Sequence, residues 1–395
     1  MASGGFTKSA SRFTPRVPGW ARSRHPYLQL LGARAVMAVG LAMALPMSTA
    51  ILAASFDSQR RGQVLGLFAS AVAIGRMTGP AVGGFLLQLG GWPWIFWMNF
   101  IVGFAVTLAV VKIFRGLGEI RYEAFDTWGA LTLLIGYPAL LGGLTFGSSL
   151  GWFAPPVIGT FMLAMLGLTS FVWIELHTAA PLIDVAMFKQ TLLAVALATA
   201  VFSTLLSHPI ALAAPLYLQN VLGSSALTTG FLLATLPLST ALASPISGRL
   251  ADRVDAGTMT AIGMTMIVAG IAGYSRLGTA ASFPSVVLVL ALLGAGIGVF
   301  TPANQKIAFA SVRQEDYGIL AAMLSSFGTA AGTIGTTIVV ALMEFRGGSG
   351  LWHDPDVLAG AQQFAFACLL PFGLLAVGIA VTGRRANKLE IVIEH

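Results

Sequence analysis

Long apolar segments alternate with short polar connections along nearly the whole chain, beginning at about residue 28. A helix needs about 20 apolar residues to cross the hydrocarbon core of a bilayer, whereas a membrane β-strand alternates in polarity over about 10 residues. The sequence has the first pattern and lacks the second, so we expect eleven membrane-spanning helices. Their approximate ranges are 28–54, 62–88, 92–113, 127–148, 153–175, 191–219, 225–247, 257–276, 284–304, 319–343 and 361–383.

The composition agrees with this pattern. Of the 395 residues, 56% are hydrophobic and only 9% are charged, whereas soluble domains carry about 25% charged residues. The expected fold class is an all-α polytopic membrane protein with about 11 transmembrane helices. The net charge of +7 comes from basic residues scattered over short connections rather than gathered on one face, which argues against nucleic acid as a partner.

Lysine and arginine collect in every second connection, as expected if those connections are cytoplasmic. That side holds thirteen of them, including Arg60 and Arg61, whereas the other side holds two, Arg276 and Arg346. We therefore predict a multi-pass cell-membrane protein with a cytoplasmic C-terminus. The basic segment 1–26 then lies outside, against the rule. It is a targeting segment, or the first helix does not insert as drawn, or the natural start lies further upstream.

Four stretches, in order along the chain, together resemble the major facilitator superfamily, specifically its drug:proton antiporter family with fourteen helices. They are GRMTGPAVGG at 75–84, GWPWIFWMNFIVG at 91–103, LYLQNVLGSSALTTG at 216–230 and GRLADRVDAG at 248–257. The first matches the antiporter motif G-x-x-x-G-P-x-x-G-G, and the last matches the superfamily's G-x-L-x-D-R loop. In the second, Pro93 replaces the usual arginine. The resemblance covers residues 28 to about 385 and implies a major-facilitator-like helix bundle.

Aligned on these motifs, the eleven helices resemble the fourth to fourteenth of fourteen, so we favour a shortened chain as the explanation of the misplaced basic tail. The expected organisation has five parts. They are a disordered tail at 1–26, the remainder of the N-terminal helical half at 27–113, two linking helices at 114–190, a six-helix C-terminal half at 191–383 and a cytoplasmic tail at 384–395.

The antiporter motif places Gly75, Gly79 and Gly83 four residues apart, on one face of a helix. Small residues let membrane helices approach closely, so this face is expected to pack against another helix. The resemblance adds that the motif, completed by Pro80 and Gly84, lies at the interface between the two halves and helps to prevent leak. Pro80 removes one backbone donor and can bend the helix.

Arg76 lies near the middle of its apolar segment. An arginine at the centre of a membrane helix costs at least about 2.5–3.5 kcal/mol on insertion scales, so it should face a water-filled pathway or an anionic partner. The family usually has a small or apolar residue here. Either Arg76 turns toward the pathway without a dedicated role, or it contacts an anion or the substrate.

Two further basic residues are candidates for coupling transport to protons. Arg34 matches the arginine of the family's R-x-x-Q-G motif, which the resemblance implicates in proton coupling, although Met37 and Ala38 replace the glutamine and the glycine. Its side chain could instead snorkel to the membrane interface. His208 could relay protons as an intramembrane histidine, or make a hydrogen-bonded contact between helices.

The GRLADR stretch lies between two predicted helices, and Gly248 is expected to permit a tight turn there. The Asp252 carboxylate can accept hydrogen bonds from free amides at a nearby helix N-terminus, where the helix dipole favours negative charge. The resemblance implies that Asp252 and Arg253 belong to a cytoplasmic latch that biases one access state. The alternative is an ordinary charged turn.

No Asp or Glu lies deep within the eleven segments, although proton-coupled transport usually needs an embedded group that titrates. The family's principal embedded carboxylate belongs to its first helix, which has no counterpart here. The sequence contains no H-E-x-x-H, P-loop or dinucleotide-binding motif, so we expect no metal, no cofactor and no enzymatic activity.

The sequence therefore predicts a secondary transporter of the cell membrane that acts as a monomer. It would exchange protons for small lipophilic or cationic compounds by alternating access around a midplane cavity. The alternative is a shortened or degenerate transporter that inserts into the lipid bilayer without coupled transport.

Overall fold

The computed structural model describes residues 25–91, 93–113, 126–178, 190–348, 351 and 354–393. The regular structure in these ranges is helical throughout, and they contain no strand. The contacts divide the chain into two compact units, Met1–Ser48 and Thr49–His395. The all-α membrane fold class predicted from the sequence is confirmed.

In the first unit, the described residues form the larger part of helix α1, which runs from His25 to Ser55. Pro46 lies inside this helix. The Ser48 hydroxyl donates a hydrogen bond to the Ala44 carbonyl at 2.7 Å. A polar side chain in an apolar helix is thereby satisfied within the helix itself, as the bilayer requires.

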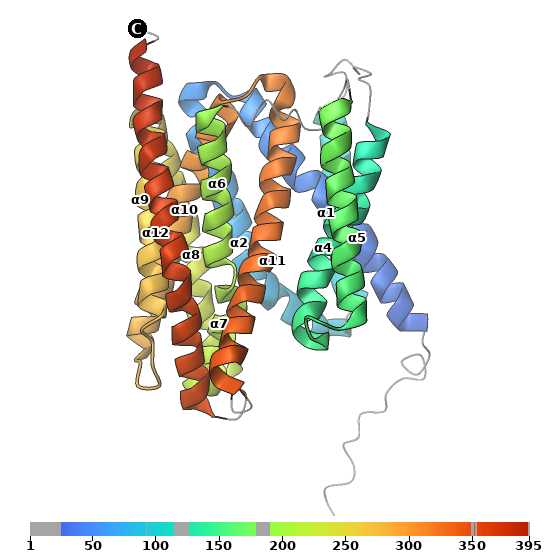
Figure 1. The fold of residues 1–395 in the computed structure, drawn as a ribbon, viewed down its shortest axis with the longest axis vertical. Helices are drawn as coiled ribbons and strands as arrows, with labels where there is room; N and C mark the ends of the chain where they lie inside the picture. Colours follow the sequence, from blue (N-terminus) through green and yellow to red (C-terminus); the bar gives the residue numbers. More distant parts are fainter. Residues whose placement is uncertain are drawn as a thin grey trace, which may run out of the picture. The chain divides into compact units, whose positions relative to one another are not determined.

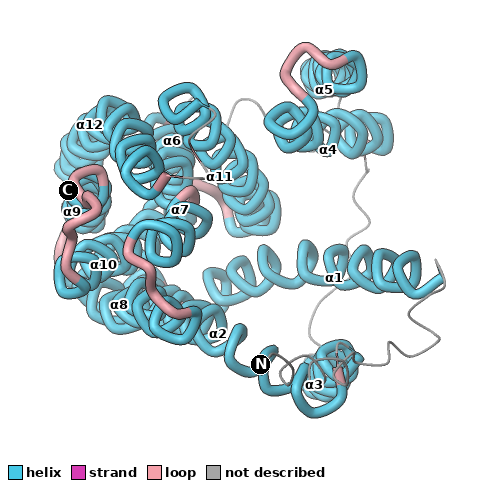
Figure 2. Tube along the Cα trace, turned by 90° about the horizontal axis from the view of Figure 1, so that it is seen from below, coloured by secondary structure: helices cyan, strands magenta, loops and turns pink. Residues whose placement is uncertain are grey.

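The second unit holds the end of α1 and the remaining helices. These are α2 (Ser58–Gly90), α3 (Pro93–Ile113), α4 (Thr127–Leu150), α5 (Pro155–His177), α6 (Thr191–Ser207), α7 (Ile210–Leu216), the π-helix η3 (Tyr217–Val221), α8 (Ala226–Arg253), α9 (Ala256–Tyr274), α10 (Phe283–Ala310), the 3-10 helix η4 (Gln314–Asp316), α11 (Tyr317–Gly347) and α12 (Pro355–Ile393). Helices α6, α9, α10 and α12 lie side by side (Figures 1 and 2).

Ten helical stretches are long and apolar enough to cross a membrane over their described residues. One of them, Thr191–Val221, combines α6, α7 and η3, and is interrupted at Pro209, which has no N–H to continue the helix. Helix α2 covers the predicted segment 62–88 and has the necessary length, but it carries three arginines and is not among the ten. With α2, the long helical stretches correspond to the eleven predicted segments.

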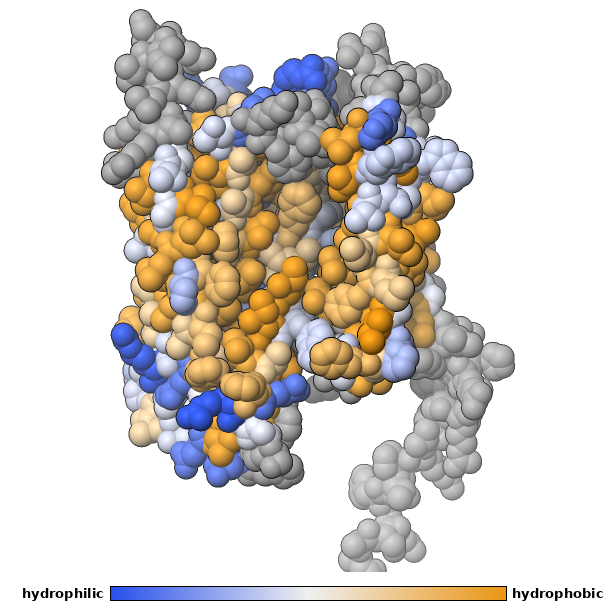
Figure 3. Space-filling model, in the orientation of Figure 1, coloured by the Kyte–Doolittle hydropathy of each residue, from blue (hydrophilic) through white to orange (hydrophobic). Residues whose placement is uncertain are grey.

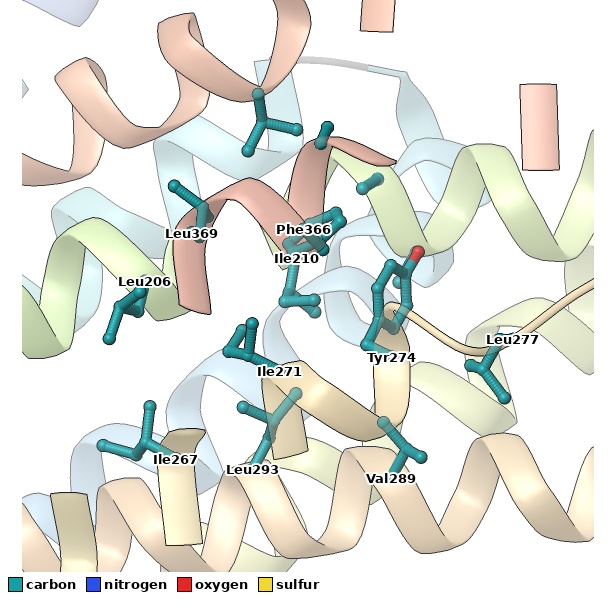
Figure 4. Packing of buried hydrophobic residues seen from close by; sticks show 14 of the residues in the cluster. Leu206, Ile210, Ile267, Ile271, Tyr274, Leu277, Val289, Leu293, Phe366 and Leu369 are labelled. Carbon is teal, nitrogen blue, oxygen red and sulfur yellow. The ribbon is translucent and has the colours of Figure 1, made fainter. Parts of the chain in front are cut away.

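The main apolar core joins helices from the C-terminal part of the chain. Figure 4 shows Leu206 and Ile210 facing Ile271 and Phe366, which come from α9 and α12. Helices come close here because glycines face neighbouring backbones. A Cβ added at Gly263 of α9 would lie 2.5 Å from the Phe300 amide of α10. Packing of this kind replaces the hydrophobic driving force that a bilayer does not supply.

Helices α4 and α5 form a hairpin with its own close contact. A Cβ added at Gly136 would lie 2.8 Å from the backbone nitrogen of Leu168, beside Gly167. The hairpin is joined to α11 by the Tyr137 hydroxyl, which donates to the Ser326 carbonyl at 2.6 Å. The hairpin is therefore hydrogen-bonded through α4 to the C-terminal part of the bundle.

Apolar residues cover much of the face shown in Figure 3, and hydrophilic residues gather toward its two ends. This distribution suits helices that cross a bilayer, because only their ends reach water.

Candidate functional site

Helices α2 and α8 cross with their backbones in close contact at one end, which we call the Asp252 end. A Cβ added at Gly62 would lie 2.7 Å from the Gly248 carbonyl oxygen, and one at Gly66 would collide with the Ser244 carbonyl. Gly248 therefore does not form the turn expected from the sequence. It lies within α8, where it leaves room for the Gly62 backbone.

The Asp252 carboxylate joins three helices. It accepts hydrogen bonds from the backbone amides of Gly62 (3.0 Å) and Gln63 (2.8 Å), near the beginning of α2. Lys306 of α10 donates to the same carboxylate at 2.8 Å and to the Ala251 carbonyl, also at 2.8 Å. The Asp252 side chain is only 8% exposed.

Asp252 and Arg253 form the last turn of α8 rather than a connection between helices, which corrects the sequence expectation. Arg253 is exposed. Lys306 was not singled out from the sequence, because it lies 54 residues from Asp252 and only the fold brings them together.

Beside this contact, apolar side chains fill the Asp252 end of the second unit. We call five of them the apolar plug: Leu65 of α2, Leu193 and Leu197 of α6, Phe309 of α10 and Leu320 of α11. All five are at most 5% exposed. The Arg61 guanidinium lies over the neighbouring Tyr317 ring, 5.2 Å from its centroid. The plug therefore joins α2, α6, α10 and α11 through buried apolar side chains at the Asp252 end.

Arg76 and His208 lie beyond the plug. Arg76 follows Leu65 by 11 residues along α2, and His208 follows Leu197 by 11 residues at the end of α6. Eleven residues make about three helical turns, or about 16 Å, and return to the same helix face. Both side chains are exposed, and the charge of Arg76 is close enough to act on His208. The fold thus places two of the predicted coupling residues at a similar distance beyond the plug.

His208 also contacts α11. Its ring packs over Gly332, where an added Cβ would lie 2.8 Å from the ring carbon Cγ. Its Nδ1 lies 3.3 Å from the Thr336 hydroxyl oxygen, and that hydroxyl donates to the Gly332 carbonyl at 2.9 Å. Because the hydroxyl hydrogen is used there, Nδ1–H is the donor to Thr336. In neutral His208, Nε2 is then the proton acceptor.

The glycines of the antiporter motif lie on α2 beyond the plug. Among the described residues, no atom lies within 4 Å of a Cβ added at Gly75, Gly79 or Gly83. Pro80 and Gly84 are not among the residues whose surroundings the structure describes. The packing and antiport roles of the motif stay predictions, and the observed close approach of α2 is made by Gly62 and Gly66, whose four-residue spacing is visible in the sequence.

Arg34 belongs to the part of α1 that forms the first unit. Its role in proton coupling stays a prediction.

Two carboxylates that the sequence placed at the edges of connections are buried together. Asp126, at 7% exposed, caps α4 by accepting a hydrogen bond from the Gly129 amide at 2.8 Å. Glu175, at 5% exposed, lies in the last turn of α5. A Cβ added at Gly129 would collide with the Asp126 carboxylate and lie 3.3 Å from Glu175 Oε1. The two acids therefore share one small space at the end of the hairpin.

Comparison with known proteins gives a consistent family match. The profile of the Major Facilitator Superfamily matches residues 17–336 and, in a second match, 191–389. The multidrug transporter protein MdtP of Bacillus subtilis is 24% identical over 81% of this chain and 60% of its own length. The multidrug resistance protein Stp of Mycobacterium tuberculosis is 27% identical over 78% and 58%.

Two further similarities are more distant or differ in coverage. The lincomycin resistance protein LmrB of Listeria monocytogenes is 23% identical over 80% of this chain and 68% of its own length. A crystal structure of a bacterial homologue of the iron transporter ferroportin, in an outward-facing state with soaked iron, matches 89% of this chain and 90% of that one, with a TM-score of 0.38 and 14% identity. The chain spans about 60% of the length of MdtP and Stp.

Proposed function

Because the chain belongs to the Major Facilitator Superfamily, we propose that it is a secondary transporter that exports small lipophilic compounds across the cell membrane by alternating access. Its relatives include proteins named for multidrug transport and multidrug resistance. Activity of this kind needs a pathway that is closed on one side of the membrane while polar groups are reachable from the other.

One observation carries this proposal: the Asp252 end is closed while residues beyond it are exposed. Asp252 ties α8 to α2 and α10, and the apolar plug fills the same end. Arg76 and His208, about three turns further on, are exposed. We assign the Asp252 end to the cytoplasm from the distribution of Lys and Arg. In this assignment the conformation is outward-facing, and Asp252 is the latch that holds the inner side shut.

Proton coupling is part of the proposal. Nε2 of neutral His208 can accept a proton, and the positive charge of Arg76 acts on this ring, so protonation of His208 and occupation of the site near Arg76 influence each other. Arg34 is a further candidate for this coupling. We propose that a monomer is sufficient, with protons and a small-molecule substrate as its transported partners.

The test is transport by the purified 395-residue chain in liposomes. An imposed proton gradient should drive fluorescent lipophilic dyes across the membrane, and a protonophore should abolish that movement. A panel with one neutral, one cationic and one anionic dye keeps the result independent of substrate charge. If correctly inserted protein moves none of the dyes, the chain is a transporter relative that inserts without coupled transport, and the proposal is wrong.

A further inference from the structure

We infer that the site beyond the plug selects amphipathic anions, with Arg76 binding the carboxylate or similar acidic group of the substrate. The inference rests on the proposed transport function and names the substrate class of the same site. It narrows the lipophilic compounds that the sequence predicted to acidic ones and departs from the cationic compounds predicted beside them.

The balance of charge within the described helices favours an anion. Arg76 lies near the middle of α2, and its positive charge acts on His208. The acidic residues of the described spans lie at helix ends. Glu175 is in the last turn of α5, Asp252 is held by Lys306, and Glu344 is near the end of α11. A cation entering this region would meet repulsion from Arg76 with no described carboxylate beside it to offset that repulsion.

The chemistry of the two basic groups suits an acidic ligand. A guanidinium presents paired N–H donors that match both oxygens of a carboxylate. Arg76 is exposed, and its position in a membrane helix means that an anionic partner removes the cost of leaving the charge uncompensated. His208 uses Nδ1 toward Thr336, so its Nε2 is the atom that can donate to the same anion once the ring is protonated.

An apolar surface lies next to the plug. Leu324 and Phe327 of α11 are only partly buried and pack against the plug. They precede Thr336 along the same helix, so they lie between the plug and the polar groups. A substrate with an acidic group near Arg76 could therefore place its apolar body on Leu324 and Phe327. This separation of charge and apolar surface predicts amphipathic acids rather than small inorganic anions.

The experiment compares three probes that share one aromatic skeleton: naphthaleneacetate, naphthaleneacetamide and naphthylmethyl-trimethylammonium. Their binding to the purified full chain in nanodiscs is measured at neutral pH. We expect the carboxylate to bind about tenfold more tightly than the amide, and the cation to bind most weakly. Arg76→Gln should remove the preference for the carboxylate, whereas Arg76→Lys should retain part of it because the charge remains.

Arg276→Gln is the matched control, since it removes an exposed positive charge from the connection between α9 and α10. It should leave the ratio between the probes unchanged. Equal binding of the three probes, or preference for the trimethylammonium probe, would overturn the inference and leave the transport proposal standing. Absence of binding by all three would also overturn it, and dye movement in liposomes would then decide separately whether the chain transports. The wild-type ratio decides even if Arg76→Gln does not fold.

Discussion

The Nζ atom of Lys306 lies 2.8 Å from Oδ1 of Asp252, and the same carboxylate accepts two backbone hydrogen bonds from α2. A single side chain on α8 is thus held from two sides. The lysine contributes from α10, and the helix N-terminus contributes from α2. Removing Asp252 breaks both connections and leaves the lysine charge without its carboxylate, whereas removing Lys306 leaves the backbone hydrogen bonds in place.

We therefore expect Asp252→Ala, which removes both acceptor oxygens, to open the Asp252 end more than Lys306→Met does. A hydrogen bond to a charged group contributes about 1.5–3 kcal/mol, so the opened population should rise about tenfold or more. Opening is measured as the rate at which a maleimide labels the cysteine introduced by Ser70→Cys. In the native protein Ser70 is buried, and its hydroxyl donates to the Ala241 carbonyl at 2.8 Å. The native Cys368 is first replaced by alanine.

Asp356→Asn is the control for this labelling, because it removes an exposed acid at the start of α12. It should not change the labelling rate. Equal labelling rates in Asp252→Ala and Lys306→Met would contradict the conclusion that the α2 amides and Lys306 each hold Asp252 separately.

A second prediction concerns the glycines of α2. Gly66→Ala should lower the thermal stability of the protein, because its Cβ collides with the Ser244 carbonyl. Overpacking of this kind costs about 1–3 kcal/mol. Gly75→Ala on the same helix should leave stability nearly unchanged, since its Cβ meets no described atom within 4 Å. Thermal unfolding in detergent compares the two variants, and a larger loss for Gly75→Ala would contradict the observed position of the helix contact.

The third prediction is a pH dependence that follows from the proposed anion site. Protonation of His208 adds positive charge near Arg76, so naphthaleneacetate should bind more tightly as the pH falls from about 7 to about 5. The probe itself stays mostly ionised over this range because its carboxyl group titrates near pH 4. His208→Gln should make the affinity independent of pH. Affinity that changes equally with pH in this variant would show that another group is responsible.

The fourth prediction concerns the buried acids of the α4–α5 hairpin. Asp126→Asn keeps an N-cap acceptor for the Gly129 amide and removes a negative charge beside Glu175. It should therefore leave stability unchanged or raise it. Asp126→Ala loses the cap and should cost about 1 kcal/mol. The two variants are compared by thermal unfolding, and equal destabilisation by both would mean that the ionised carboxylate is itself required.

The helices were predictable because a membrane span is specified by the length of an apolar segment, which is a local property. The interruption at Pro209 is also local, because proline cannot continue the backbone hydrogen bonds. The family motifs were equally visible in the sequence. The turn expected at Gly248 was wrong, because a glycine in a membrane helix can serve close packing as well as a turn, and residue spacing alone does not separate the two.

The contacts of the candidate site were not predictable in the same way. The carboxylate of Asp252 meets the Gly62 amide across 190 positions, and Tyr137 reaches the Ser326 carbonyl across 189. Such pairs are set by how helices pack rather than by local periodicity. Arg76 follows Leu65 by the same number of residues as His208 follows Leu197. This equal spacing could have suggested the pairing of Arg76 with His208, but only after the plug was known.

The Asp252 carboxylate accepts hydrogen bonds from the backbone of α2 and not from its side chains. Substitutions at Gln63 other than proline therefore leave this hydrogen bond intact, whereas Gly62 must stay glycine because an added Cβ would lie 2.7 Å from Asp252 Oδ1. A hydrogen bond is lost, however, when donor and acceptor separate by little more than an ångström. The contact with the carboxylate therefore depends little on which side chains most positions of α2 carry. It is broken when the helix as a rigid body is displaced by a small distance.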